Sequence, residues 1–154
     1  MHAYPFKPKT TAYIRPGDFW ALPLAHGMFG CGRVIELMPG SRKRLLVGLI
    51  NWIGNAKPTG EQIAGKRTVA QGEVHLRCIH ETGGEILGHR PLSCDLIEPD
   101  FFLSESPGRS CMLLQGYRVI RPATADEQKE LSVFPGWGYL LIQHQAQALA
   151  KSAA

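Results

Sequence analysis

Short apolar segments alternate with polar ones along the chain, and glycine and proline separate them. Three apolar segments follow one another at 19–24, 28–37 and 45–53. The first carries apolar side chains on both faces, which predicts a strand near the centre of the core. His26-Gly27 and a polar loop at 39–44 lie between the segments, so we expect consecutive antiparallel strands joined by short loops.

Two glycines in the second of these segments predict a close approach. Gly30 and Gly32 flank Cys31, so both lie on the same face of the expected strand. Without side chains at these positions, a bulky ring or another backbone can pack there, or the strand can bend.

The second half of the chain gives a mixed pattern. Segments 73–80 and 85–89 flank Gly83-Gly84, which predicts a hairpin that places Cys78 opposite His89. Residues 92–110 are acidic and loop-like, with 101–103 as a hydrophobic plug that holds the loop to the body. Segments 111–114 and 117–120 are predicted to be further strands.

Three segments are predicted to be helical. Thr59 and Gln62 have capping-box spacing before a short helix at 61–66. Thr124, followed by Asp126 and Glu127, predicts a helix that lasts to about residue 131. Residues 137–150 can form a terminal helix with one apolar stripe, and the last residues are expected to fray.

Together these patterns predict an α+β fold that is mainly antiparallel β. We expect a curved sheet or SH3-like half-barrel with short helices and a C-terminal helix. A chain of 154 residues fits one hydrophobic core. Pro5 and Pro8 disfavour regular structure near the start, so residues 1–12 are predicted to be a flexible arm and 13–151 a single β-rich domain.

The apolar segments, the cysteines and the charge indicate the compartment and the kind of partner. The longest apolar run, at 45–54, is too short to span a membrane, and no apolar stretch near the start resembles a secretory signal. We therefore expect a cytoplasmic protein with no membrane partner. Its four cysteines (Cys31, Cys78, Cys94, Cys111) are expected to be reduced and buried. The net charge is +7 over residues 1–77 and −3 over 78–154, which slightly favours an acidic partner.

Motifs for catalysis are not found in the sequence. It has no G-x-S-x-G elbow, no phosphate-binding loop and no dinucleotide-binding glycine pattern after a strand. Cys78, His80 and His89 give at most two or three metal ligands, without the short spacing that zinc sites use. We predict no catalytic residue, no metal and no cofactor.

Two charged loops are candidate binding sites. The basic cluster Arg42, Lys43 and Arg44, together with Lys66-Arg67, is the best nucleic-acid candidate. Three cations at a hairpin tip are more often a solvated loop, and we favour that interpretation. The acidic loop carries Asp95, Glu98, Asp100 and Glu105.

Residues 17–24 read Gly-Asp-Phe-Trp-Ala-Leu-Pro-Leu, and 26–35 read His-Gly-Met-Phe-Gly-Cys-Gly-Arg-Val-Ile. This opening resembles the immunity protein 26 family of bacterial polymorphic toxin systems, and 86–92 is similar to the family's closing Ile-Gly-x-x-Pro stretch. The resemblance implies an antidote without enzymatic activity, which binds and blocks a cognate toxin domain. Loop side chains would then give specificity, and we expect contacts from Arg42, Lys43, Arg44, Asp95, Glu98, Asp100 and Glu105.

Two other functions stay open. The Gly-Asp-x-x-x-x-Pro-Leu opening is also similar to that of SH3-like barrel ribonuclease toxins. Those enzymes continue with Lys-x-Arg-Pro before an apolar strand, whereas this chain has Arg42-Lys43-Arg44-Leu45 without the proline. A small RNA-binding barrel is the third possibility, and salt-dependent binding would identify it. The sequence leaves the oligomeric state open.

Overall fold

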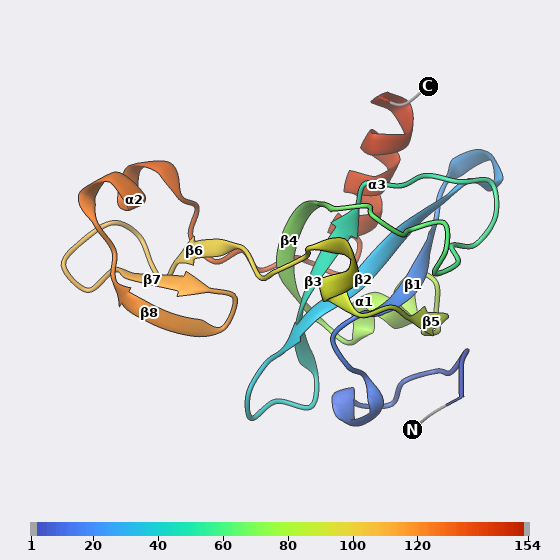
Figure 1. The fold of residues 1–154 in the computed structure, drawn as a ribbon, viewed down its shortest axis with the longest axis horizontal. Helices are drawn as coiled ribbons and strands as arrows, with labels where there is room; N and C mark the ends of the chain where they lie inside the picture. The colour runs from blue at the N-terminus through green and yellow to red at the C-terminus, as the bar shows by residue number, and fades with distance from the viewer. Residues whose placement is uncertain (1–2, 153–154) are drawn as a thin grey trace.

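The computed structural model describes residues 3–152, which form two antiparallel sheets (Figure 1). The larger sheet has five strands in the order β4-β3-β2-β1-β5, and it is open. Its strands are β1 (Asp18–Pro23), β2 (Phe29–Leu37), β3 (Arg44–Ile50), β4 (Thr68–His75) and β5 (Gly88–His89). The expected consecutive strands are therefore confirmed, because β1, β2 and β3 are neighbours in chain order and in space.

A second, three-stranded sheet extends from the side of the first (Figure 1). It consists of β6 (Phe101–Leu103), β7 (Met112–Gln115) and β8 (Arg118–Pro122), and the helix α2 (Ala125–Glu130) follows. We call residues 101–133 the small lobe. Thr124 and Glu127 form the predicted capping box at the start of α2. The remaining helices are α1 (Arg77–Glu81), α3 (Leu141–Ser152) and the 3-10 turns η1 (Thr11–Tyr13), η2 (Ala25–Gly27) and η3 (Leu92–Asp95).

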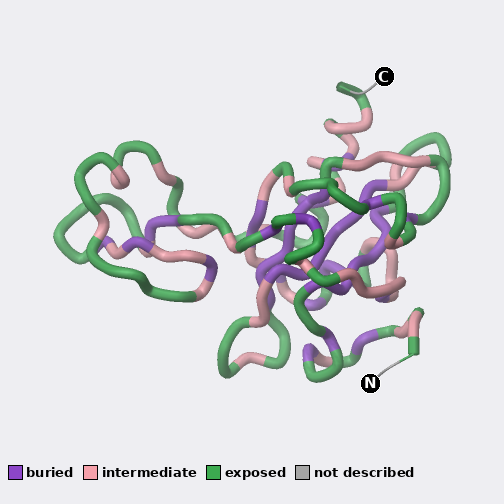
Figure 2. The backbone as a smooth tube through the Cα atoms, in the orientation of Figure 1, coloured by how far each residue is buried: buried purple, intermediate pink, exposed green. Residues whose placement is uncertain are grey.

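These elements confirm the predicted α+β class with mainly antiparallel strands and a C-terminal helix. Most buried residues belong to the large sheet and its cover, whereas the small lobe is mostly exposed (Figure 2). No helix in residues 3–152 is long and apolar enough to cross a membrane.

Both faces of the large sheet are buried, which explains the continuous apolar runs of β1 and β3. On one face, Trp20, Val34 and Val47 pack against Ile79 of α1 and Ile142 of α3. On the other face, Phe19 and Ile35 contact the segments that follow β3 and β5. The further buried members of this second face are Cys31, Leu46, Ile50, Ile63, Ile97 and Phe102. Strands buried on both faces cannot show a simple alternation of apolar and polar residues.

Gly30 and Gly32 have the close neighbours that their spacing predicts. A Cβ atom on Gly32 would lie 2.5 Å from Cζ2 of Trp20, so the indole ring occupies the space of the missing side chain. A Cβ atom on Gly30 would lie 3.0 Å from the Cβ of Ala146 in α3. The two glycines therefore let Trp20 lie flat on β2 and let α3 approach the sheet closely.

The hairpin predicted across 73–89 is wrong. β4 ends at His75, and the chain then forms α1. Cys78 and Ile79 are both buried in this helix, whereas a strand would turn adjacent side chains to opposite faces. β5 pairs with β1 instead, so His89 lies opposite Asp18 and not opposite Cys78.

Two helix predictions also need correction. Gln62 N donates to Thr59 Oγ1 at 3.3 Å and Thr59 N donates to Gln62 Oε1 at 3.2 Å, but only turns follow this capping box. Gly65, with φ of +76°, breaks the helical conformation. The terminal helix begins at Leu141 and not at Trp137, because Trp137 N donates to Glu73 O and so pairs with β4.

The segment 3–12 of the predicted arm contacts the main body. Phe6 and Ile86 exchange backbone hydrogen bonds of 3.0 and 2.8 Å, and Thr11 N donates to Arg42 O at 2.9 Å. Residues 1–2 of the arm and 153–154 of the predicted frayed tail lie outside the described residues. The flexibility of the arm and the bounds of the 13–151 domain stay predictions.

Candidate partner-binding surface

The basic loop between β2 and β3 is exposed, as the sequence predicts. Arg42, Lys43 and Arg44 all face solvent. The Ser41 hydroxyl accepts hydrogen bonds from the backbone N–H groups of Lys43 and Arg44 at 3.1 and 3.0 Å, which fixes the turn. Arg44 reaches Glu73 on β4 at 3.7 Å, so one of the three cations already has a carboxylate nearby.

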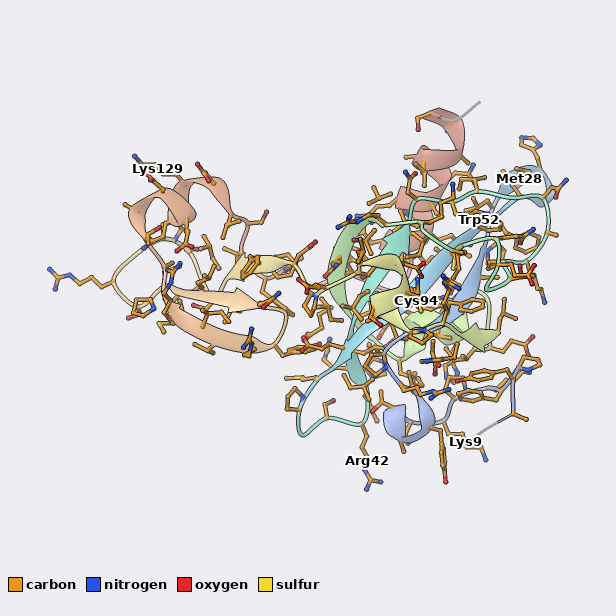
Figure 3. All side chains as sticks on the ribbon, viewed as in Figure 1. Lys9, Met28, Arg42, Trp52, Cys94 and Lys129 are labelled. Atoms are coloured by element: carbon orange, nitrogen blue, oxygen red, sulfur yellow. The ribbon has the colours of Figure 1, made fainter. Side chains whose placement is uncertain are left out.

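Lys43 also lines a concave site that we call the basic pocket. It has a volume of about 420 Å³, and its polar lining residues are Lys9, Lys43, His75, Arg77, His80 and Glu81. The arm, the β2–β3 loop, the end of β4 and α1 each contribute to it. Lys9 and Arg42 project from the same lower edge of the molecule in Figure 3.

Hydrogen bonds determine which ring nitrogen carries the proton in the two histidines of the basic pocket. Arg77 N donates to His75 Nδ1 at 3.0 Å, so that nitrogen carries no proton and Nε2 is the donor of the neutral ring. His80 Nε2 lies 2.6 Å from Pro8 O and therefore donates to it. Burial and the nearby charges of Arg44, Lys43, Arg77 and His80 lower the pKa of His75.

The acidic residues of the candidate site are not equivalent. Asp95 is buried, which contradicts the expectation of an exposed loop, and its carboxylate is not on the surface. Glu98, Asp100 and Glu105 are exposed. Partial burial of the carboxyl group nevertheless raises the pKa of Asp100.

The basic and acidic loops do not meet. Glu98 O accepts from the Gln71 side chain at 2.9 Å, near the middle of β4. His75, beside the basic pocket, is four residues further along the same strand, or about 13 Å at the usual rise per residue. Glu105 lies in the small lobe. The predicted contact residues therefore form separate surfaces.

Asp95 belongs to a buried ion network. Arg33 Nη1 on β2 lies 2.7 Å from Asp95 Oδ2, and neither side chain is exposed. Arg90 Nε is 2.9 Å from the same oxygen, and Gly65 N donates to Oδ1 at 2.6 Å. Burial alone would raise the pKa of Asp95, but the hydrogen bonds from Arg90, Gly65 and Arg33 outweigh it and lower the pKa to about 2.

A second buried carboxylate, Asp18, connects β1 to β5 and the arm. Its Oδ1 accepts from Tyr4 OH at 2.7 Å and lies 2.9 Å from His89 Nδ1. Its Oδ2 accepts from Arg15 N at 3.1 Å. The contacts of this Asp–His pair fasten three chain segments together, which is a structural role.

Three of the four cysteines are buried, and all four are free. Burial raises the pKa of the Cys31 thiol strongly and that of Cys78 to about 12, so both stay protonated. Cys94 is exposed, so the expectation of four buried thiols is wrong at that position. In the described part of the chain, no group of three or more His, Cys, Asp and Glu side chains could hold a metal ion.

Sequence reasoning found Lys43 of the basic pocket but not its partners. His80 is considered there only as a metal ligand, and Lys9 and Arg77 are not singled out. The available signal was the spacing of His75 and Arg77, two residues apart within the expected strand at 73–80. The contribution of Lys9 could not be found, because it depends on how the arm folds against α1.

Comparison with known proteins finds one matching family. The model of the family Immunity protein 26 matches residues 15–110. No curated protein and no solved structure matches the chain. The matched region contains the whole five-stranded sheet, whereas β7, β8, α2 and α3 lie beyond it.

The residues that carry the resemblance are fold determinants in the structure. Gly32 makes room for Trp20, Arg33 pairs with Asp95, and Asp18 pairs with His89. The closing stretch meets the opening one, because Arg33 Nη2 donates to the carbonyl oxygens of residues 90 and 91. The motif therefore builds the scaffold.

Proposed function

Because the chain belongs to the Immunity protein 26 family, we propose that it binds a cognate bacterial toxin domain and neutralises it without catalysis. The family match is the observation that carries this proposal. Under this proposal, the protein acts in the bacterial cytoplasm as the antidote of a polymorphic toxin system. The five-stranded sheet is a rigid support, and exposed loops contact the toxin.

The contact surface belongs to the proposal too. Arg42, Lys43 and Arg44 are exposed cations on a turn whose backbone is fixed by hydrogen bonds, so a partner does not have to order that backbone. Glu98, Asp100 and Glu105 are exposed at and beyond the junction with the small lobe. Asp95 is left out of the contact set because it is buried.

Growth rescue tests the proposal. We expect the adjacent gene to encode a large secreted protein with a toxin-like C-terminal domain. Expression of that domain in a bacterial host should stop growth, and co-expression of the chain should restore it. If growth is not restored by a folded, well-expressed chain, the proposed function is wrong.

Alanine substitution tests the contact residues separately. A variant with alanine at Arg42, Lys43 and Arg44, and a second with alanine at Glu98, Asp100 and Glu105, should each weaken rescue. A matched control replaces Arg109 and Lys129, which are exposed cations of the small lobe, and should rescue as the wild type does. Full rescue by a variant that combines both triple substitutions would remove this contact assignment.

An RNA-cleavage assay separates the proposal from the ribonuclease alternative. Purified chain is incubated with a labelled RNA, and the products are separated by size. The proposal expects intact RNA at any protein concentration, whereas cleavage that co-purifies with the chain would favour a ribonuclease.

A further inference from the structure

We propose that the basic pocket is an acceptor site for carboxylates of an acidic segment of the toxin. This inference rests on the proposed function and specifies the chemistry of the partner. It goes beyond the basic loop, because four of the five cationic or imidazole side chains come from other segments. The pocket residues are Lys9, Lys43, His75, Arg77 and His80.

The donors of the pocket are already oriented. Arg77 Nε lies 2.9 Å from Glu81 Oε1, and the guanidinium stacks on the Tyr139 ring at 4.5 Å from its centroid. These two contacts orient the guanidinium at the pocket. His75 presents Nε2–H as a donor because its Nδ1 accepts a backbone hydrogen bond. Little conformational entropy is lost when such groups bind a ligand.

The positive charge of the pocket is only partly compensated from within. Among its described lining residues Glu81 alone carries a carboxylate, and Arg77 already pairs with it. Neither Lys9 nor Lys43 forms an ion pair within residues 3–152. Two ammonium groups and one guanidinium thus face a concave site of about 420 Å³, which attracts an anion.

The arm completes the pocket. His80 Nε2 donates to Pro8 O at 2.6 Å, which places the next residue, Lys9, at the rim. Thr11 N donates to Arg42 O, so the arm is held to the basic loop as well. The site is therefore an assembly of segments that lie about seventy residues apart in the sequence, as the His80–Pro8 contact spans 72 residues.

A carboxylate ligand fits better than a nucleic acid. Single-stranded nucleic acid is bound along a basic groove with exposed aromatic rings on which bases stack. Here the cations surround one compact pocket, and Arg77 covers a face of the nearby Tyr139 ring. Lysine and arginine donors around a pocket suit the side chains of Asp or Glu that project from a folded partner.

The experiment measures binding of a hexaglutamate peptide to the full chain by isothermal titration calorimetry. The test variant combines Lys9→Glu and Lys43→Glu, which reverse two exposed charges that form no ion pair with any described residue. The control combines Arg109→Glu and Lys129→Glu, which change the net charge equally on the small lobe. Figure 3 shows Lys129 there, far from Lys9. Circular dichroism and thermal unfolding confirm that both variants fold.

We expect the test variant to bind hexaglutamate at least about tenfold more weakly than wild type. The control should bind within about twofold of wild type, because only the test variant loses charged hydrogen bonds to the peptide. Equal weakening in both variants would overturn the proposal, since net charge alone would then explain binding. Tighter pocket-dependent binding of a hexanucleotide RNA than of hexaglutamate would also overturn it, in favour of a nucleic-acid ligand.

Growth rescue separates this inference from the proposed function. Loss of rescue by the test variant, with rescue by the control, supports the pocket as the acceptor site. Full rescue by the test variant overturns the pocket and leaves neutralisation intact. Absence of rescue by wild type refutes the proposed function, and the hexaglutamate titration still decides whether the pocket binds carboxylates.

Discussion

The substitution Asp95→Asn removes the charge that Arg33 needs while it keeps nearly the same shape. Arg33 and Asp95 are both fully buried, and their closest atoms are 2.7 Å apart. Arg33 Nε already has no hydrogen-bond partner within residues 3–152, so the guanidinium has little spare stabilisation. In the variant, a buried cation stays without a counter-charge, which is the costly outcome for a buried pair.

The expected loss of unfolding free energy can be estimated from general values. Breaking a buried ion pair by removal of one partner costs about 3–5 kcal/mol. Domains are stable by only about 5–15 kcal/mol, so this is a large fraction of the total. For a chain of this length, each kcal/mol lowers Tm by about 2–4 °C, and the variant should melt about 6–20 °C below wild type.

Urea unfolding followed by tryptophan fluorescence measures this loss, and Trp20 in the core supplies a suitable signal. The control is Glu81→Gln, which breaks the exposed pair with Arg77 and should cost about 0.5 kcal/mol or less. A double variant, Arg33→Met with Asp95→Leu, removes the unpaired cation and should recover part of the lost stability. A loss below about 1 kcal/mol for Asp95→Asn would show that Arg33 does not depend on this carboxylate for its burial.

Three further predictions concern stability. The pKa of Asp95 is lowered to about 2, so its contribution to stability is complete above the unfolded pKa near 3.8 and is lost as pH falls through 2. This contribution is worth about 2 kcal/mol, and acid unfolding of Asp95→Asn should lack it. Gly32→Ala should cost about 1–3 kcal/mol through contact with Trp20, whereas Gly60→Ala, with open space around it, should be neutral in the same urea assay. Thr124→Ala should destabilise α2 by about 1 kcal/mol, seen as faster amide exchange there.

The sequence was sufficient for local features. The first three strands follow from apolar segments separated by turn residues, and Thr124 with Glu127 marks the start of α2. Gly30 and Gly32 correctly indicated close packing, although the sequence could not show that Trp20 and Ala146 fill the space.

The errors come from long-range contacts. Asp95 looked like one exposed acid among several, but it pairs with Arg33, 62 residues away in the sequence. The segment after His75 could alternate as a strand or turn as a helix, and only its packing against the sheet decides. The basic pocket draws on the arm, a loop and α1, so no single stretch of sequence contains it.

The most direct test of the account is a titration of the purified cognate toxin domain, at a fixed concentration well above the dissociation constant, with the purified chain. The account predicts that toxin activity falls in a straight line and reaches zero at a fixed molar ratio, as it does for a stoichiometric binder. Undiminished toxin activity at excess chain, or complete inactivation by a small fraction of an equivalent, would contradict it.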